Sequence, residues 1–207
     1  MDNTDIAIAT YDKTADAYTQ MYFDDASDHP YFDPFIALLP ENPIVLDVGC
    51  GPGNTSAYLL QKGCDVRGID ISDEMLKIAR QKVPLGRFSH MDMRHLGYPD
   101  STFDGILAAY SLIHIPSDQI VTTLQGFHRV LRDHGVMEII TQQGEPDRIV
   151  DDHLKVGEKM FFNFFTKERI SRYLIDAGFT IVSQEIWIGS NTYDLSDGVI
   201  YTIARKT

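Results

Sequence analysis

The stretch that decides the fold is Val45-Leu46-Asp47-Val48-Gly49-Cys50-Gly51-Pro52-Gly53, in which a short apolar run ends on closely spaced glycines. Residues 44–48 are too few for a helix and rich in β-branched side chains, so they predict a buried strand. Glycine is needed where a turn is tight and where a ligand presses against bare backbone. The pattern therefore predicts a strand followed by a ligand-binding turn.

Outward from this turn, strand and helix patterns alternate, which is typical of a parallel sheet covered by helices on both faces. Strands are expected at 66–70, 87–90, 103–109 and 136–141. Helices are expected at about 57–62, after Ser72 or Asp73, from Ser117 through Leu131 and at 166–177, with Gly63, Gly135 and Gly178 following three of them. Two β-rich runs, 180–188 and 198–204, are joined by a short link that favours an antiparallel hairpin.

Two segments fall outside this alternation. Residues 1–43 predict helices, one of them with Asp33 as its cap and Pro34 as its first residue. Residues 142–165 predict a long connection, and such connections in compact domains are usually functional or disordered. The aromatic content of 160–165 argues against disorder and favours packing, with a lid over a pocket as the alternative.

Charge and composition exclude several classes of partner. Lys and Arg number 18 against 30 Asp and Glu, for a net charge of -12. Duplex nucleic acid and anionic membranes usually require a basic surface, so neither is expected. Two cysteines are too few for a disulfide framework or a cysteine-built metal site, and no carboxylate constellation indicates a metal. No apolar run approaches the roughly 18 residues that a membrane span needs, so none is expected. The acidic N-terminus does not resemble a signal peptide, which predicts a cytoplasmic protein.

Acidic residues at the ends of the later strands extend the pattern of the glycine turn. Asp70 ends the second predicted strand before Ile71-Ser72-x-x-Met75-Leu76, and Asp92 follows the third. These motifs, with glycines at alternate positions and an acid two residues before the first, resemble the class I S-adenosylmethionine (SAM)-dependent methyltransferases over roughly residues 40–141 and 166–206. Nucleotide-binding Rossmann domains space their third glycine one residue later, which disfavours a nicotinamide dehydrogenase.

The resemblance implies an α/β fold: a Rossmann-like, doubly wound, mostly parallel seven-stranded sheet with an N-terminal helical segment. The closing antiparallel hairpin would supply strands 6 and 7. A single methyltransferase domain would then occupy 1–207. Its parts would be an N-terminal helical cap (1–43), a SAM-binding core (44–141), an insert or lid (142–165) and a C-terminal helix and hairpin (166–207).

The resemblance also implies how SAM is bound and S-adenosylhomocysteine released. Asp47 and Gly49 would hold the amino-acid end, Asp70 the ribose, and Ala109 the ammonium through its carbonyl. Adenine would contact Ile71, Met75, Asp92 and Met93. The implied cofactor-binding residues are Tyr18, Asp47, Gly49, Cys50, Gly51, Gly53, Asp70, Ile71, Met75, Asp92, Met93 and Ala109. Simpler interpretations stay open, because aspartates also cap helices and turns.

Other residues are candidates for binding the methyl acceptor or for removing its proton. The segment Tyr11-Asp12-x-x-Ala15-x-x-Tyr18 is similar to the lead-in helix of small-molecule methyltransferases, which folds over the cofactor; ordinary packing is the alternative. His114, just beyond the fourth strand, is a candidate base for an amine or hydroxyl, or else orders its loop.

We expect an enzyme that methylates a small molecule at N, O or C. The alternatives are a protein or RNA methyltransferase and a SAM-binding regulator without catalysis.

Overall fold

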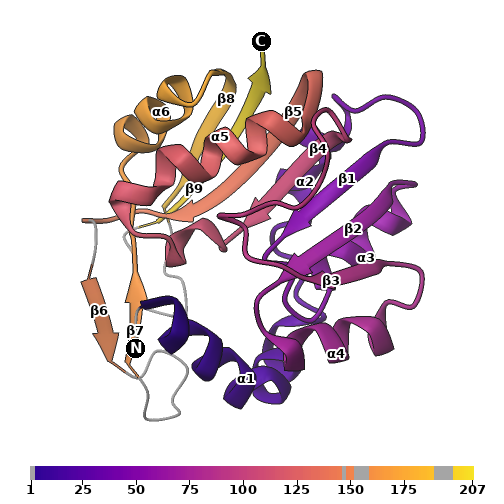
Figure 1. The fold of residues 1–207 in the computed structure, drawn as a ribbon, viewed down its shortest axis with the longest axis vertical. Helices are drawn as coiled ribbons and strands as arrows, with labels where there is room; N and C mark the ends of the chain where they lie inside the picture. The colour runs from indigo at the N-terminus through magenta and orange to yellow at the C-terminus, as the bar shows by residue number, and fades with distance from the viewer. Residues whose placement is uncertain (1–2, 146–147, 152–158, 189–197) are drawn as a thin grey trace.

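Residues 3–145, 148–151, 159–188 and 198–207 are described by the computed structural model, whose centre is a seven-stranded sheet (Figure 1). The strand order is β3-β2-β1-β4-β5-β9-β8. The strands are β1 Ile44–Val48, β2 Asp65–Asp70, β3 Arg87–His90, β4 Phe103–Ala109, β5 Leu131–Gln142, β8 Phe179–Trp187 and β9 Val199–Lys206. The first five run parallel, and β9 is antiparallel to both β5 and β8. The predicted doubly wound fold and closing hairpin are confirmed.

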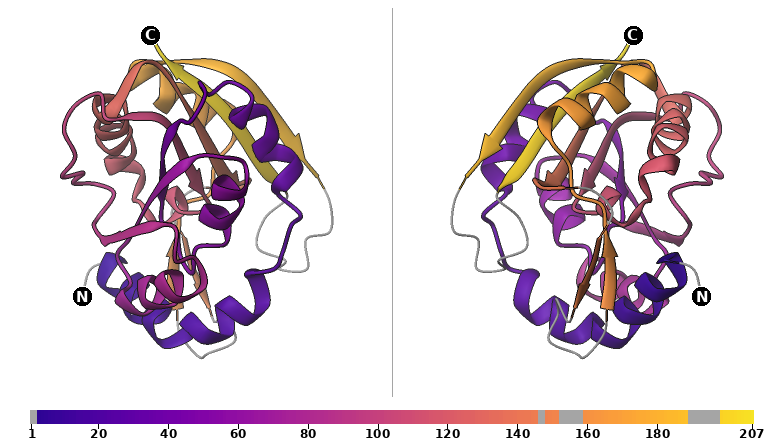
Figure 2. Two further views of the ribbon diagram at one scale, coloured as in Figure 1. Left: turned by 90° about the vertical axis from the view of Figure 1, so that its right-hand side faces the viewer. Right: turned by 90° about the vertical axis from the view of Figure 1, so that its left-hand side faces the viewer.

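Helices cover both faces of this sheet (Figures 1 and 2). They are α1 Asn3–Tyr22, α2 His29–Ile36, α3 Asn54–Gln61, α4 Asp73–Lys82, α5 Ile120–Val130 and α6 Lys167–Asp176, with 3₁₀ turns η1 Leu112–His114 and η2 Ser117–Gln119. One apolar cluster joins α5 and α6 to the sheet and a second joins α2 and α3 to its other side. Successive strand side chains point to opposite faces, so Val45 and Leu46 enter different clusters.

The strand order reverses next to the glycine turn. β1 pairs in parallel with β2 on one side and with β4 on the other, although β3 and its connections intervene in the sequence. Open α/β sheets bind ligands at the carboxyl ends of their strands at this kind of position. Helix α1 lies across that end of the sheet, in contact with α4 and β7 (Figures 1 and 2). The fold therefore places a helical cover over the turn.

One predicted helix end is wrong. The helix after β4 begins with the 3₁₀ turn η2 and ends at Val130, and Leu131 already pairs with Phe103 in β5. The left-handed residue is His134, at φ 63°, and Gly135 lies inside the span of β5. An apolar residue at helical spacing suits a helix and a strand equally, so Leu131 gave no local signal that the strand had begun.

The predicted start of the second helix is also wrong. α2 begins at His29 after Asp28, and Pro34 lies inside it. Pro30 suits the first turn as well as Pro34 does, because the amides there have no partner within the helix. The Asp33 carboxylate accepts a hydrogen bond from Tyr58 Oη at 2.7 Å, so it links α2 to α3 instead of capping a helix.

The insert contains a hairpin that the sequence did not predict. β6 (Arg148–Asp151) pairs antiparallel with β7 (Lys159–Phe162), while residues 146–147 and 152–158 of the insert, like residues 1–2 of the cap, lie outside the described residues. Met160, Phe162, Phe164 and Phe165 are buried, which confirms the packing interpretation of this aromatic segment. Among the described helices, none is long and apolar enough to cross a membrane.

Candidate functional site

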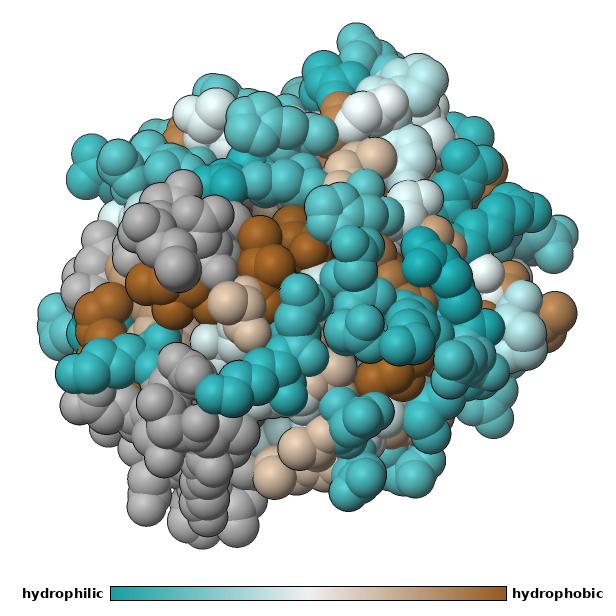
Figure 3. Space-filling model, turned by 60° about the horizontal axis from the view of Figure 1, so that its bottom comes forward, coloured by the Kyte–Doolittle hydropathy of each residue, from teal (hydrophilic) through white to brown (hydrophobic). Residues whose placement is uncertain are grey.

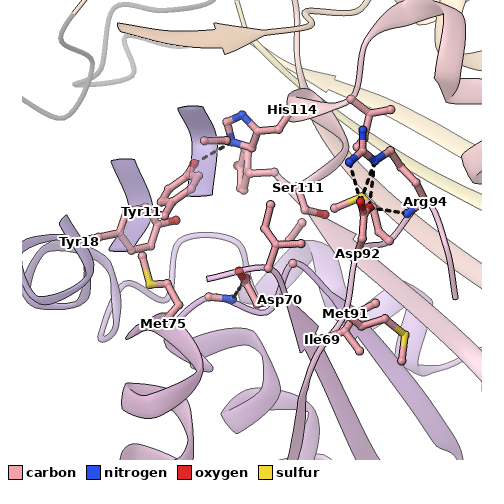
Figure 4. Close-up of a pocket in the computed structure, with 18 residues that line it drawn as sticks. Tyr11, Tyr18, Ile69, Asp70, Met75, Met91, Asp92, Arg94, Ser111 and His114 are labelled. Atoms are coloured by element: carbon pink, nitrogen blue, oxygen red, sulfur yellow. Dashed lines mark hydrogen bonds and ion pairs between the residues drawn. The ribbon is translucent and has the colours of Figure 1, made fainter. Parts of the chain in front are cut away.

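A cavity of about 770 Å³, its open mouth included, lies at the carboxyl ends of β1, β2 and β4 beneath α1 (Figure 4). The structure brings ten of the predicted residues to its wall. They are Tyr18, Gly49, Gly51, Asp70, Ile71, Met75, Asp92, Met93, Ala109 and His114. Segments far apart in the sequence therefore converge on one site, as expected where parallel strands end.

The glycine turn forms the floor of this cavity. Gly49, Gly51 and Gly53 have φ values of 68°, 51° and 90°, in the left-handed region that side chains disfavour. A Cβ on Gly49 would lie 2.3 Å from Ser111 Cβ, whereas a Cβ on Gly51 would meet nothing within 4 Å. Gly49 is thus required for close packing against the segment after β4. Gly51 leaves open space above the backbone.

Two predicted residues lie behind the turn and outside the cavity wall. Asp47 is buried, and its Oδ2 accepts a hydrogen bond from Ser56 Oγ at 2.6 Å, which ties β1 to α3. Burial raises the pKa of Asp47 to about 7. A Cβ on Gly53 would come within 3.0 Å of Val83 Cγ2, at the end of α4. Both residues support the shape of the turn from the side opposite the cavity.

Asp70 organises the turn while lining the cavity. Its Oδ2 accepts from the Gly51 amide at 2.8 Å and its Oδ1 from the Ser72 amide at 2.9 Å. Burial raises the pKa of this carboxyl. Each carboxylate oxygen has a second lone pair, so these bonds leave capacity for hydroxyl donors. Asp70 thus does not cap α4, but it holds the amide of the residue that does, and it also lies in the cavity wall.

Ser72 connects the cover to the sheet. It is the N-cap of α4, accepting from the Met75 amide at 3.2 Å, as one of the two predicted caps. Its hydroxyl donates to Asp12 Oδ1 of α1 at 2.6 Å. One serine therefore fixes both the start of α4 and the position of α1 above the cavity.

On the opposite wall, Asp92 is already paired (Figure 4). Arg94 Nη2 and Nε lie 2.6 Å and 2.9 Å from Asp92 Oδ2. Burial alone would raise the pKa of Asp92, but the hydrogen bonds from the Arg94 side chain and backbone hold it below its ordinary value. The carboxylate therefore stays charged, with Arg94 as a fixed neighbour in the same wall.

Tyr11 and His114 form a hydrogen-bonded pair at the top of the cavity (Figure 4). Tyr11 Oη lies 2.7 Å from His114 Nε2, and His114 Nδ1 lies 3.2 Å from the Phe161 carbonyl oxygen. Because a carbonyl only accepts, a neutral His114 carries its proton on Nδ1 and accepts from Tyr11 at Nε2. Burial raises the pKa of Tyr11 well above its ordinary value, so its phenol stays protonated.

Two further cavities adjoin the first. One, of about 500 Å³, is lined by Cys50 and the start of α3; the other, of about 690 Å³, is lined by Tyr22, Gln142 and Phe162. Tyr18 and Tyr110 line all three cavities. Cys50, the remaining predicted residue, thus lies in the second cavity and not in the first. The three spaces meet at the two tyrosines.

Several wall residues escaped the sequence analysis. Tyr110 and Ser111 follow β4 directly, and Gln142 ends β5. Their position after a parallel strand is the same signal that pointed to Asp70, so it could have found them. Ser111 Oγ is buried and has no hydrogen-bond partner among the described residues. Arg94 carried no such signal, because it comes two residues after Asp92 in a loop.

Comparison with known proteins adds a family. Residues 45–135 match the family model described as "Methyltransferase domain". The chain is 40% identical over 103 residues to Methyltransferase GfsG of Streptomyces halstedii, covering 46% of this chain and 36% of that protein. It is 32% identical over 111 residues to the malonyl-[acyl-carrier protein] O-methyltransferase of Enterobacter lignolyticus, covering 53% and 43%. The alignments span less than half the length of both relatives.

A solved structure shares the fold over nearly the whole chain. It is the 1,6-didemethyltoxoflavin-N1-methyltransferase of Burkholderia thailandensis, with 1,6-didemethyltoxoflavin and S-adenosylhomocysteine bound. The TM-score is 0.77 at 24% identity, covering 99% of this chain and 88% of that one. Sheet order, glycine turn and family match agree with one another. Residues 45–135 of this chain therefore match a methyltransferase domain, and the chain has the fold of a methyltransferase solved with S-adenosylhomocysteine bound.

Proposed function

We propose that this chain binds SAM in the first two cavities and transfers its methyl group to a small molecule in the third. One observation carries the proposal: three cavities meet at Tyr18 and Tyr110, over the carboxyl ends of the parallel strands. Such a junction gives donor and acceptor separate chambers with a common boundary. The predicted roles of Asp70, Met75 and Ala109 in holding SAM belong to this proposal.

Three features of the chain fit SAM. The open space above Gly51 admits a ligand against bare backbone. The Ser111 hydroxyl is buried without a partner among the described residues, and a ligand atom would satisfy it. Asp70 offers carboxylate lone pairs beside this space, which suits ribose hydroxyls. Asp92 is paired with Arg94, so we expect both side chains to contact the adenine.

SAM supplies a methyl group on a positively charged sulfur, whose departure as a neutral thioether makes the group easy to transfer. The main task of the chain is therefore to align the acceptor and exclude water. Holding two reactants in the right geometry can lower a barrier by about 7–11 kcal/mol. Helix α1 and the buried residues of β7 close the site on two sides, so Tyr11, Tyr18 and Phe162 can restrict the acceptor's approach.

The Tyr11–His114 pair gives an acceptor proton a route out. An N–H or O–H acceptor loses a proton as its lone pair bonds to the methyl carbon. Tyr11 Oη can take that proton while passing its own to His114 Nε2, 2.7 Å away. The phenol remains neutral throughout, consistent with its raised pKa. In this proposal His114 acts as the base through Tyr11.

A small acceptor is supported by the position of the third cavity beside the first two and by the excess of acidic residues. The Burkholderia relative named above holds a small heterocycle. Of the predicted insert at 142–165, we assign Gln142 and Phe162 to the wall of this chamber, because both line it.

Calorimetry with S-adenosylhomocysteine tests the donor site. Ser111→Ala should weaken binding by about fivefold, the loss of one hydrogen bond of roughly 1 kcal/mol. Ser171→Ala, in α6 and outside the lining of all three cavities, is the matched control and should leave binding unchanged. Failure of the wild-type protein to bind SAM or S-adenosylhomocysteine would overturn the proposal.

A screen of small acceptors with radiolabelled methyl groups tests the reaction. Transfer to a small molecule is the expected result. Binding of SAM without transfer to any small molecule, protein or RNA would instead identify a regulator.

A further inference from the structure

Aromatic side chains make up much of the wall of the third cavity. Aromatic rings from three parts of the chain line it: Tyr11, Tyr18 and Tyr22 of α1, Tyr110 after β4, and Phe162 of β7. The Tyr18 and Tyr22 ring centroids lie 4.5 Å apart. The planes of these two rings are inclined by 45°, and those of Tyr11 and Tyr18 by 85°. Aromatic rings can stack on a planar guest or meet it edge-on, so this lining favours a planar aromatic guest over a flexible aliphatic one. A ligand in this cavity would therefore contact aromatic rings on several sides.

The charged groups in this wall all have one sign. Asp25 and Asp28 line this cavity on the side that it shares with the second one, and the described lining residues of the third cavity include no Lys or Arg. Burial raises the pKa of Asp28, so Asp25 is the main source of negative charge here. Asp28 Oδ1 accepts hydrogen bonds from Tyr201 Oη at 2.7 Å and Tyr110 Oη at 3.1 Å, which hold the carboxyl beside the junction. A carboxylate or phosphate on the acceptor would lie near these acids without a described counter-charge. Electron-rich rings and acids together suit an ammonium or an N–H group.

Gln142 supplies an independent observation. It ends β5 in the wall of the third cavity and lines neither of the other two. Its side chain is 8% exposed, and its Oε1 has no hydrogen-bond partner among the described residues. A buried acceptor atom left unpaired costs about 1–3 kcal/mol. A ligand that donates an N–H to this amide would remove that cost.

We infer that the acceptor is a planar aromatic or heteroaromatic molecule that carries an N–H or ammonium donor and no negative charge. This inference rests on the proposed function and narrows its acceptor. The rings would hold the plane of the molecule, Gln142 would accept its N–H, and the acids would favour positive over negative charge. An acyl group bearing a free carboxylate is excluded by the same reasoning.

Three probes of similar size test the inference: tryptamine, tryptophol and indole-3-acetate. They share the indole ring and differ in a terminal ammonium, hydroxyl or carboxylate. Calorimetry is performed on the full chain saturated with S-adenosylhomocysteine. Tryptamine should bind most tightly, with a Kd at least tenfold below that of indole-3-acetate and tryptophol between them. Equal or tighter binding of indole-3-acetate, or no binding of tryptamine, would overturn the inference.

Variants separate the contributions. Gln142→Leu should weaken tryptamine and tryptophol alike by about fivefold, because both share the indole N–H, and leave the Kd of S-adenosylhomocysteine unchanged. Gln61→Leu, at an exposed position at the end of α3, is the control for the same change. Asp25→Asn should bring the Kd values of tryptamine and indole-3-acetate closer together. An unchanged response to both Gln142→Leu and Asp25→Asn would refute the assigned contacts.

The donor and acceptor tests fail separately. S-adenosylhomocysteine binding with a reversed probe order would overturn only the acceptor inference. Absence of S-adenosylhomocysteine binding would overturn the proposed function itself.

Discussion

Glu138 is a carboxylic acid buried in the middle of a central strand. It lies in β5 with 1% of its surface exposed, and neither of its carboxyl oxygens has a hydrogen-bond partner among the described residues. Burial, aided by the negative charge of Asp28, raises the pKa of Glu138 from 4.5 to about 9. The folded protein therefore holds a neutral carboxylic acid at pH 7. We predict that this group makes the stability of the protein depend on pH.

Proton linkage gives the direction and the size of the change in the free energy of unfolding with pH. Below pH 4.5 the group is protonated in both the folded and the unfolded state and has no pH-dependent effect. Between pH 4.5 and about 9 only the unfolded state ionises, so stability falls as pH rises. The slope is about 1.4 kcal/mol per pH unit. From pH 5 to pH 7 Glu138 should therefore lower the free energy of unfolding by about 2.5 kcal/mol.

Glu138→Gln removes the titration and keeps the shape of the side chain. Urea unfolding at several pH values, followed by circular dichroism, gives the free energy of unfolding of each protein. The difference between variant and wild type should grow in favour of the variant by about 2.5 kcal/mol between pH 5 and pH 7. This change with pH cancels any constant cost of burying the amide.

Glu185→Gln, on the exposed part of strand β8, is the matched control and should give a constant difference. Parallel pH profiles for wild type and Glu138→Gln would refute the reasoning. That result would mean that the folded carboxyl ionises near its ordinary pKa.

Three further predictions concern the site and its support. Tyr11→Phe should lower kcat for an N–H or O–H acceptor by about 100-fold, because the proton relay loses its hydroxyl. Adding His114→Ala should cost little more, because the two residues act as one relay. Steady-state kinetics of the single and double variants check this, and losses that multiply in the double variant would contradict it. Ser72→Ala should lower the free energy of unfolding by about 1 kcal/mol, measured in urea, because α4 loses its cap. Gly49→Ala should cost at least about 1–2 kcal/mol for its left-handed backbone, and more from contact with Ser111, so Ser111→Gly should restore only part of the loss.

Local patterns predicted the frame of the fold because they depend on neighbouring residues alone. β1 and β4 have the bounds read from their apolar runs, β3 has the predicted bounds although its sequence marks it poorly, and α6 lies within the predicted range 166–177 with Thr166 as its cap. The patterns failed where two structures share one signal. Leu131 suits a helix face and a strand equally, and proline can occupy the first turn of α2 at either of two positions. In both places a tertiary contact decided the outcome.

The sequence by itself determined the glycine turn, the acid at the end of the second strand and the family resemblance that they carry. It could not determine which residues of the turn face the cavity. Asp47 contacts Ser56 behind the turn and Gly51 borders open space, and this difference depends on how the chain bends between them. Nor could it pair Tyr11 with His114, which are 103 residues apart. That contact exists only because α1 folds over the sheet end. Strand ends fix where a site lies, whereas its chemistry depends on side chains that only packing brings together.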